Sequence, residues 1–243
     1  MHARAGLSAA LLLILFASGC QAASDSPSTS GSVKLGLMTT LPLYWGEADE
    51  VGELLRSQAS AGWVRQALER RYVLEPVDAL DAQALRGIDR LLLAQPRALS
   101  PDENVALDRW VRAGGRLLLF ADPMLTAHSR YGIGDRRRPQ DVILLSPILS
   151  HWGLGLAFDE NQNPDQATVD IHATPVPIAL AGTLQATPAS RCVVAGARVL
   201  AECRVGKGRV TVLADAAVLD DPHDASLEEH SDALAMLVAR AFD

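Results

Sequence analysis

The stretch DRLLLAQPRALSPDENVALDRWVRAGGRLLLFADP, residues 89–123, contains a complete strand–helix–strand unit. The apolar run at 90–94 predicts the first strand. The tetrapeptide SPDE at 100–103 places a serine before the helix, a proline at its first position and a glutamate at its third, which is a capping box. Gly-Gly at 114–115 predicts the helix end. The apolar run at 116–121 is typical of a strand buried on both faces, as in a parallel sheet covered by helices.

The same alternation of strands and helices continues on both sides of this unit. Further strands are predicted at 33–38, 72–77 and 209–214, and helices at 47–71, 79–86, 146–152 and 227–242. Residues 154–180 mix short strands with proline turns, and residues 191–205 predict a hairpin around Gly196. We therefore expect an α/β fold with a mainly parallel central sheet flanked by helices, and with a β-rich insertion or edge.

Composition and charge exclude several classes of protein. The chain has 243 residues, of which 49% are apolar, and 22 Lys and Arg against 29 Asp and Glu give a net charge of −7. Such a composition is typical of a globular domain with an extension. The acidic balance argues against a nucleic-acid-binding protein, which usually presents a basic face.

The N-terminus has the features of a secretory signal. A basic start is followed by the apolar run of residues 7–16 and by Ala-Ser-Gly before Cys20. This pattern resembles a bacterial lipobox, in which Cys20 would be diacylated; an ordinary signal peptide with an incidental cysteine is the alternative. We expect a lipoprotein signal peptide at 1–19, a lipidated cysteine with a flexible Ser-rich tether at 20–32, and the α/β domain at 33–243.

The lipobox predicts a location in the bacterial cell envelope, facing the periplasm and anchored to a membrane by the N-terminal lipid. Gln21, at the second position of the mature chain, favours the outer membrane, although the inner membrane stays possible. In that oxidising compartment Cys192 and Cys203, on opposite arms of the predicted hairpin, are expected to form a disulfide. Free buried thiols and metal ligation are the alternatives.

Acidic residues follow two of the buried strands. Asp122 and Asp215 each end an apolar run, and ligands of open α/β sheets gather at the carboxyl ends of the strands. These acids, with Tyr44 and Trp45 in the loop after the first strand, could line a ligand crevice. The alternative is that each aspartate caps the turn that follows it, and that the aromatic pair packs into the core.

The segment 220–224 and its histidine neighbours give weaker signals. Asp220, Asp221 and Asp224 lie near His223 and His230, but no metal-ligand spacing is compelling, and a solvated loop is the simpler interpretation. No Gly-x-Cys-x-Gly or Gly-x-Ser-x-Gly elbow that would carry a nucleophile occurs in the chain. We therefore expect no catalytic residues, no metal and no cofactor.

Three segments resemble the GldG-like auxiliary domain of ABC transporters: residues 89–123, LLSPILSHWGLGL at 144–156 and VGKGRVTVLADAAVLDD at 205–221. The resemblance implies a non-catalytic α/β domain of the class I glutamine amidotransferase-like, or flavodoxin-like, type. It also implies partners among the permease and ATPase subunits of an ABC-type system. Members of that family carry a C-terminal transmembrane helix, which is not predicted here, and lipidation at Cys20 would replace that anchor.

These features predict a lipid-anchored envelope protein that serves as a non-catalytic accessory or binding component of an ABC-type transport system. The alternatives are an envelope ligand-binding or sensor domain, and a metal-dependent hydrolase. Both alternatives would use the crevice at Asp122 and Asp215.

Overall fold

The structure is a computed structural model that describes residues 2, 33–47, 62–222 and 227–243. The strands are β1 (Lys34–Thr39), β2 (Val73–Pro76), β3 (Arg90–Ala94), β4 (Arg116–Phe120), β5 (Leu154–Ala157), β6 (Ala167–Ile171), β7 (Thr174–Ile178), β8 (Thr183–Ala186), β9 (Cys192–Ala195), β10 (Leu200–Val205) and β11 (Gly208–Leu213). The helices are α2 (Trp63–Glu69), α3 (Pro101–Ala113), α4 (Ser146–His151), α5 (Leu227–Phe242) and the 3-10 turn η1 (Ala217–Leu219). These elements belong to one unit, Ser32–Asp243.

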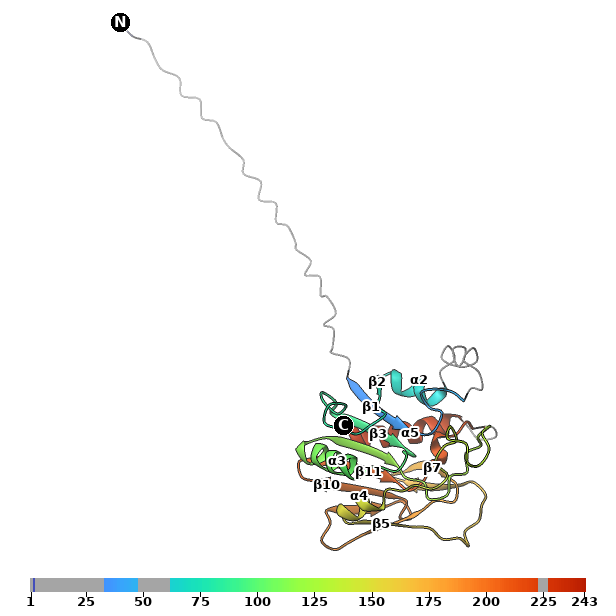
Figure 1. Cartoon of the computed structure of the whole chain (residues 1–243). Helices are drawn as coiled ribbons and strands as arrows, with labels where there is room; N and C mark the ends of the chain where they lie inside the picture. The colour runs from blue at the N-terminus through green and yellow to red at the C-terminus, as the bar shows by residue number, and fades with distance from the viewer. Residues whose placement is uncertain (1, 3–32, 48–61, 223–226) are drawn as a thin grey trace. The chain divides into compact units, whose positions relative to one another are not determined.

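A seven-stranded sheet in the order β2-β1-β3-β4-β11-β10-β9 forms the centre of this unit (Figure 1). The first five strands in that order pair in parallel, whereas β10 and β9 add to β11 as antiparallel strands. Two small antiparallel sheets, β5–β8 and β6–β7, account for the region of short strands and proline turns. The expected mixed α/β fold with a mainly parallel sheet is confirmed, and the β-rich region is both an insertion and an extension of the sheet edge.

Helices cover the central sheet on both faces, which explains the continuous apolar runs. Leu92 and Leu118 point to the face where side chains of α2 and α5 pack. Leu91 and Leu117 point to the opposite face, against residues of α3 and α4. All four leucines are fully buried. A strand that is covered on both faces cannot alternate between apolar and polar residues, so β3 and β4 have no polar side.

The helix start predicted at residues 100–103 is confirmed in atomic detail. The Glu103 N–H donates to Ser100 Oγ at 3.2 Å, and the Ser100 N–H donates to Glu103 Oε2 at 2.9 Å. Glu103 also accepts from the Leu80 N–H and pairs with Arg97 at 2.7 Å. The Arg97 guanidinium and the backbone donors hold the pKa of Glu103 down at about 2, against the opposing effect of burial. The cap therefore also fixes the segment between β2 and β3 to α3.

Two glycines shape the C-terminal end of α3, where the helix lies close to the start of β11. Gly114 adopts a φ of 130°, a conformation that glycine tolerates and other residues rarely adopt. A Cβ atom at Gly208 would lie 2.1 Å from the Val111 carbonyl oxygen. The glycine of the GKG turn therefore allows the sheet to approach the helix backbone.

Three expectations about helices differ from the structure. Residues 79–86 form a hydrogen-bonded turn rather than a helix. The Asp81 carboxylate accepts from the Gln83 and Ala84 N–H groups as a helix N-cap would, and the Leu85 N–H donates to the Asp81 carbonyl oxygen, but the bonding then continues with i→i−3 turns from Arg86 and Ile88. Helix α4 ends at His151 rather than at the expected residue 152, and its N-cap Leu145 makes no side-chain cap. The helix expected at 47–71 is seen from Trp63 onward, after an extended Gly62.

Several predictions fall on residues outside the described ranges. These are the signal peptide at 1–19, the lipidation site Cys20, the tether at 20–32, the first part of the 47–71 helix, and His223 and Asp224. Within the described ranges, no helix combines the length and the apolar character that a membrane crossing requires.

Candidate functional site

Polar side chains connect the carboxyl ends of neighbouring parallel strands. After β1, Thr40 Oγ1 donates to the Gln95 carbonyl oxygen at 2.5 Å and accepts from the Gln140 N–H at 3.0 Å. After β3, Gln95 is fully buried, and its side chain both donates to the Asp122 carbonyl oxygen and accepts from the Asp122 N–H. Gln95 also has a φ of 44°, which is uncommon for a residue other than glycine. These two bonds to Asp122, with a third from the Gln95 side chain to the Gln140 carbonyl oxygen, fix this conformation between β3 and β4.

The two aspartates continue this connection across β4 and β11. Asp122 Oδ1 accepts from the Met124 N–H at 2.8 Å, and its Oδ2 accepts from the Ala216 N–H at 3.2 Å. Asp215 Oδ1 accepts from the Ala217 N–H at 2.6 Å, and its Oδ2 accepts from the Ala179 N–H at 2.9 Å. Each aspartate thus accepts from the turn that follows it, as the capping interpretation requires. We call Thr40, Gln95, Asp122 and Asp215 the strand-end network.

Burial dominates the electrostatics of the two aspartates, which are both 0% exposed. It raises the pKa of Asp122 to about 6, while the hydrogen bonds from Met124 and Ala216 oppose the rise. Burial and the negative charge of Asp122 raise the pKa of Asp215 well above its usual range. Two carboxylates with backbone donors on all four oxygens stabilise the fold and have no surface in contact with solvent.

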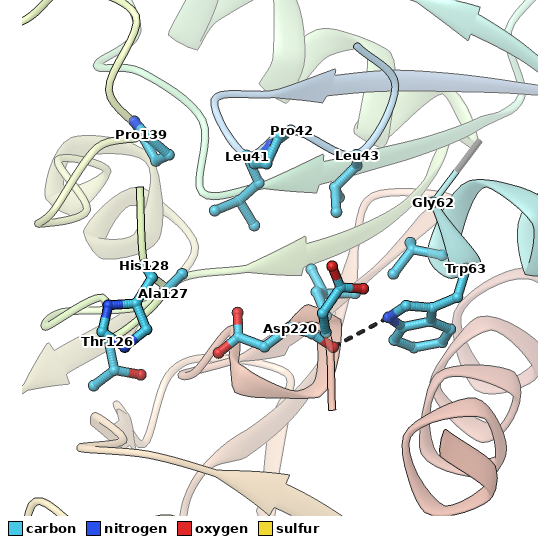
Figure 2. Close-up of a pocket in the computed structure, with 13 residues that line it drawn as sticks. Leu41, Pro42, Leu43, Gly62, Trp63, Thr126, Ala127, His128, Pro139 and Asp220 are labelled. Carbon is cyan, nitrogen blue, oxygen red and sulfur yellow. Dashed lines mark hydrogen bonds between the residues drawn. The ribbon is translucent and has the colours of Figure 1, made fainter. Parts of the chain in front are cut away.

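A cavity of about 220 Å³ lies beyond the same edge of the sheet (Figure 2). Five segments line it: residues 41–43 after β1, residues 62–64 at the start of α2, residues 126–128 and 139 from the loop after β4, and residues 219–221 at the end of η1. Strands β1 and β3 flank the point where the strand order reverses, the usual ligand position in open α/β sheets. We call this cavity the strand-end pocket.

Figure 2 shows how the side chains of the strand-end pocket are arranged. Leu41 and Leu43 project toward Asp220, with Trp63 on one side of Asp220 and His128 on the other. Trp63 is fixed by a hydrogen bond from its Nε1 to the Asp220 carbonyl oxygen at 3.1 Å. The pocket thus has apolar walls and an acidic side.

Among the residues that line this pocket, Asp220 has the pKa that departs most from its usual value. Burial, and then the negative charges of Asp122 and Asp221, raise its pKa to about 7. The interpretation of 220–224 as a solvated loop is therefore wrong for Asp220, which is half-buried at the pocket. His230 is also buried, with its Nδ1 facing the Val218 carbonyl oxygen at 3.2 Å.

The aromatic pair after β1 is divided between core and surface. The rings of Tyr44 and Trp45 meet edge to face with centroids 4.7 Å apart. Tyr44 packs against the core and under the Arg65 guanidinium, whereas Trp45 is 50% exposed. Neither ring lines the strand-end pocket, and Leu41 and Leu43 of the same loop do.

Sequence reasoning missed Gln95, Asp220 and Trp63 as parts of this edge. A signal for Gln95 was available, because Gln-Pro follows β3 just as Asp-Pro follows Ala121 at the end of β4. No local pattern places Trp63 beside Asp220, since 157 residues separate them. Among the described residues, no three His, Cys, Asp or Glu side chains are grouped so that they could hold a metal ion.

Cys192 and Cys203 form a disulfide in the structure. They are direct partners in the antiparallel β9–β10 register, with Cα atoms 4.0 Å apart. The bridge joins the edge strand β9 to the rest of the sheet. It excludes the two alternatives of free thiols and metal ligands for this pair.

A protein-family comparison matches residues 32–185, well over half of the chain, to a family described as an ABC-type uncharacterized transport system. The chain belongs to this family. The family is that of ABC transport auxiliary domains, as the resemblance predicted, and two of its three segments, 89–123 and 144–156, lie within the matched residues. No curated protein matches the sequence.

Solved structures show likeness at the level of the fold. The cold-adapted β-galactosidase from Rahnella sp. R3 aligns with 86% of this chain at 12% identity and a TM-score of 0.50. The exo-β-1,4-mannosidase Op5Man5 from Opitutaceae bacterium strain TAV5 aligns with 88% at 13% identity and the same TM-score. The chain spans only 31% and 36% of the length of these two glycosidases. The mmIFT52 N-terminal domain aligns with 86% of this chain at 15% identity and a TM-score of 0.50, and 96% of that domain is covered.

Proposed function

We propose that this protein is a lipid-anchored, non-catalytic auxiliary component of an ABC-type transport system, facing the periplasm. The family match carries the proposal, because it covers the α/β unit from its first strand through β8. The lipobox at Cys20 supports the anchor, and Gln21 favours the outer membrane. An outer-membrane anchor would require the protein to reach an inner-membrane transporter across the periplasm.

The non-catalytic role is supported by the bonds that the candidate acids and cysteines already make within the protein. All four carboxylate oxygens of Asp122 and Asp215 accept backbone hydrogen bonds, and Cys192 and Cys203 are joined to each other. A hydrolase built on these aspartates would need them to reach a substrate or a solvent molecule, and both side chains are fully buried. The glycosidase likeness adds no active site, because at this identity it concerns the fold alone.

The proposal includes the class I glutamine amidotransferase-like fold. The parallel strands run β2-β1-β3-β4-β11, which is the 2-1-3-4-5 order of flavodoxin-like sheets when β11 is counted as the fifth parallel strand. The antiparallel β10 and β9 then form an addition at one edge. This topology supports the finer assignment.

The anchor is tested by replacing Cys20 with serine in the full chain. We expect the Cys20→Ser variant to lose acyl-radiolabel incorporation and lipoprotein-type processing. The Cys192→Ser variant is a matched control, because it removes a cysteine outside the lipobox and is expected to keep the label. Unchanged labelling of Cys20→Ser would contradict the lipid anchor. Membrane fractionation of the wild type and of a Gln21→Asp variant distinguishes outer from inner membrane.

The transport role is tested by crosslinking in intact cells, followed by purification of the tagged full-length protein and mass spectrometry. We expect permease or ATPase subunits of an ABC-type system among the crosslinked proteins. Their absence, with the protein itself present at normal levels, would contradict the auxiliary role.

A further inference from the structure

The strand-end pocket combines apolar walls with an acidic side. Leu41, Leu43 and Trp63 supply apolar surface, and Asp220 and Asp221 supply carboxylates. Among the described residues, no lysine or arginine belongs to the lining. Within the described part of the chain, neither carboxylate has an ion pair. A ligand that fits this pocket is therefore apolar at one end and positively charged at the other.

We propose that the strand-end pocket binds a small organic cation, a protonated primary amine with a short apolar tail. The ammonium group would donate hydrogen bonds to the Asp220 carboxylate, and the neighbouring Asp221 would add negative charge. The tail would lie against Leu41, Leu43 and the ring of Trp63. The proposal concerns the isolated protein and does not depend on the lipid anchor or on the transporter.

The position of Trp63 supports an aromatic wall that is already in place before a ligand binds. Its indole N–H donates a hydrogen bond to the Asp220 carbonyl oxygen. Its ring packs edge to face against the buried His230 ring, with the two ring centroids 6.1 Å apart. A fixed indole beside a carboxylate offers both an apolar contact and a π-face for a cation. Because the ring is held from two sides, binding would cost little ordering of this side chain.

The charge around Asp220 also favours a cation. The buried Asp122 and the neighbouring Asp221 repel the ionised form of Asp220, which is one reason why its pKa is raised. A bound ammonium would offset this repulsion and favour the ionised carboxylate. An anionic ligand would increase the repulsion instead.

The composition of the lining argues against a metal ion as the occupant. Calcium takes about six to eight oxygen ligands, and magnesium requires near-octahedral oxygen coordination. In the described part of the lining, Asp220 and Asp221 are the residues that offer carboxylates, and the other side chains are mostly apolar. The cavity of about 220 Å³ is also below the roughly 300–1,000 Å³ of drug-sized sites, which indicates a small ligand.

Calorimetric titration of the full-length purified protein tests the proposal with three probes of one chain length: hexylammonium, 1-hexanol and hexanoate. We expect saturable binding of hexylammonium, weaker binding of hexanol and no binding of hexanoate. Equal binding of hexanol and hexylammonium, or no binding of hexylammonium, would overturn the proposal. Saturable binding of Ca²⁺ or Mg²⁺ that displaces hexylammonium would identify a metal site instead and would also overturn it.

Variants locate the binding in the strand-end pocket. Asp220→Asn keeps the size of the side chain and removes its charge, and we expect hexylammonium to bind at least about tenfold more weakly. Asp165→Asn is the matched control, because it makes the same change of charge at an exposed position outside the pocket lining. An equal loss in both variants would indicate a general charge effect and would refute a site at Asp220.

The pH dependence gives an independent readout. Asp220 is faced by Asp122, Asp221, His128 and, behind Trp63, His230. Hexylammonium should bind more tightly as the pH rises from about 6 to about 8, because Asp220 ionises in that range. The Asp220→Asn variant should lose most of this dependence. A wild-type affinity that falls over this range would contradict the proposal. Binding of hexylammonium and crosslinking to transporter subunits are separate measurements. Either the ligand proposal or the transport role can therefore be refuted without the other.

Discussion

Asp122 joins the ends of β4 and β11 through one carboxylate. Replacing it with alanine removes the acceptor for two backbone N–H groups, of which the one from Ala216 is buried. We expect Asp122→Ala to lower the free energy of unfolding by roughly 2–3 kcal/mol in urea titrations. Asp122→Asn keeps one carbonyl oxygen and should lose less. If Mg²⁺ or Ca²⁺ raised the Tm of the wild type but of neither variant, Asp122 would be a metal ligand instead of a structural acceptor.

Asp220 should make the stability of the protein depend on pH. Its pKa is about 7 in the folded protein and about 4 in an unfolded chain, so the folded state holds the proton more tightly. Its stabilising contribution is complete below about pH 4 and is lost as the pH rises through about 7. We expect the Tm to fall between about pH 5 and pH 8, and to fall less in Asp220→Asn. Asp165→Asn should retain the wild-type slope, and a Tm that rises over this range would contradict the pKa.

The roles of the buried aspartates could be predicted from the sequence only in part. The strand-end position of Asp122 and Asp215 follows from apolar runs that stop at an aspartate, and their capping role follows from the turn after each strand. Their second hydrogen bonds could not be predicted, because the donors at Ala216 and Ala179 come from other segments. The pKa of Asp220 depends in the same way on Asp122, which lies 98 positions earlier in the chain.

At the scale of elements, α3 depends on Glu103 more than on any other residue of its first turn. Glu103 accepts from the Ser100 and Leu80 N–H groups and pairs with Arg97. We expect Glu103→Ala to lower the free energy of unfolding by about 2 kcal/mol. The control Asp102→Ala changes an exposed acid in the same turn and should cost less than about 0.5 kcal/mol. Comparable losses in both variants would show that charge near the helix start matters and the specific bonds do not.

The β9–β10 hairpin gives a second prediction for an element. The bridge between Cys192 and Cys203 closes a short loop, so the loop-entropy contribution to stability is at most about 2–3 kcal/mol. The double variant Cys192→Ser/Cys203→Ser should lose up to this amount in urea titrations. A reducing agent should destabilise the wild type by a similar amount and leave the double variant unchanged. A response of the double variant to the reducing agent would point to another target.

Elements with strong local signals were predicted well, and those without them were not. The strand–helix–strand unit at 89–123 carries a capping box, glycines and apolar runs, and helix α5 carries an amphipathic pattern. Both match the structure within a few residues. Residues 79–86 begin at Asp81 like a capped helix but continue with i→i−3 bonds, so the first turn is not extended into a helix. The pairing of β5 with β8, and of β6 with β7, is decided by contacts that no local pattern encodes.

In the molecule as a whole, helices cover both faces of the central sheet, and this predicts which strands unfold locally least often. Strands β3, β4 and β11 have neighbours on both edges and buried side chains on both faces. We expect their amides to exchange hydrogen most slowly, close to the rate of global unfolding. The edge strands β2 and β9 should exchange earlier. Equal exchange rates in central and edge strands, measured by mass spectrometry, would contradict a stability centred on the sheet interior.

The class of the fold could be predicted from the sequence, because each buried strand and helix has its own pattern and their alternation indicates a parallel sheet. The strand order could not be derived from these patterns, since it depends on how the crossovers pack. The strand-end pocket could not be predicted either, because its five lining segments lie between residues 41 and 221. Only their convergence at one edge of the sheet brings Trp63 and Asp220 together.

The strand-end network has a consequence for how related proteins diverge. Its side chains bond to the backbone of neighbouring strand ends, so a change at Gln95, Asp122 or Asp215 disturbs several segments at once. The loops above it carry the pocket walls and are bonded to the network near their ends, at Met124, Gln140 and Ala216, so their middle parts can vary more freely. Descendants of one ancestor should therefore share these polar residues while their loops differ in length and chemistry. Duplicated copies in one genome could then acquire different ligands without redesigning the sheet below them.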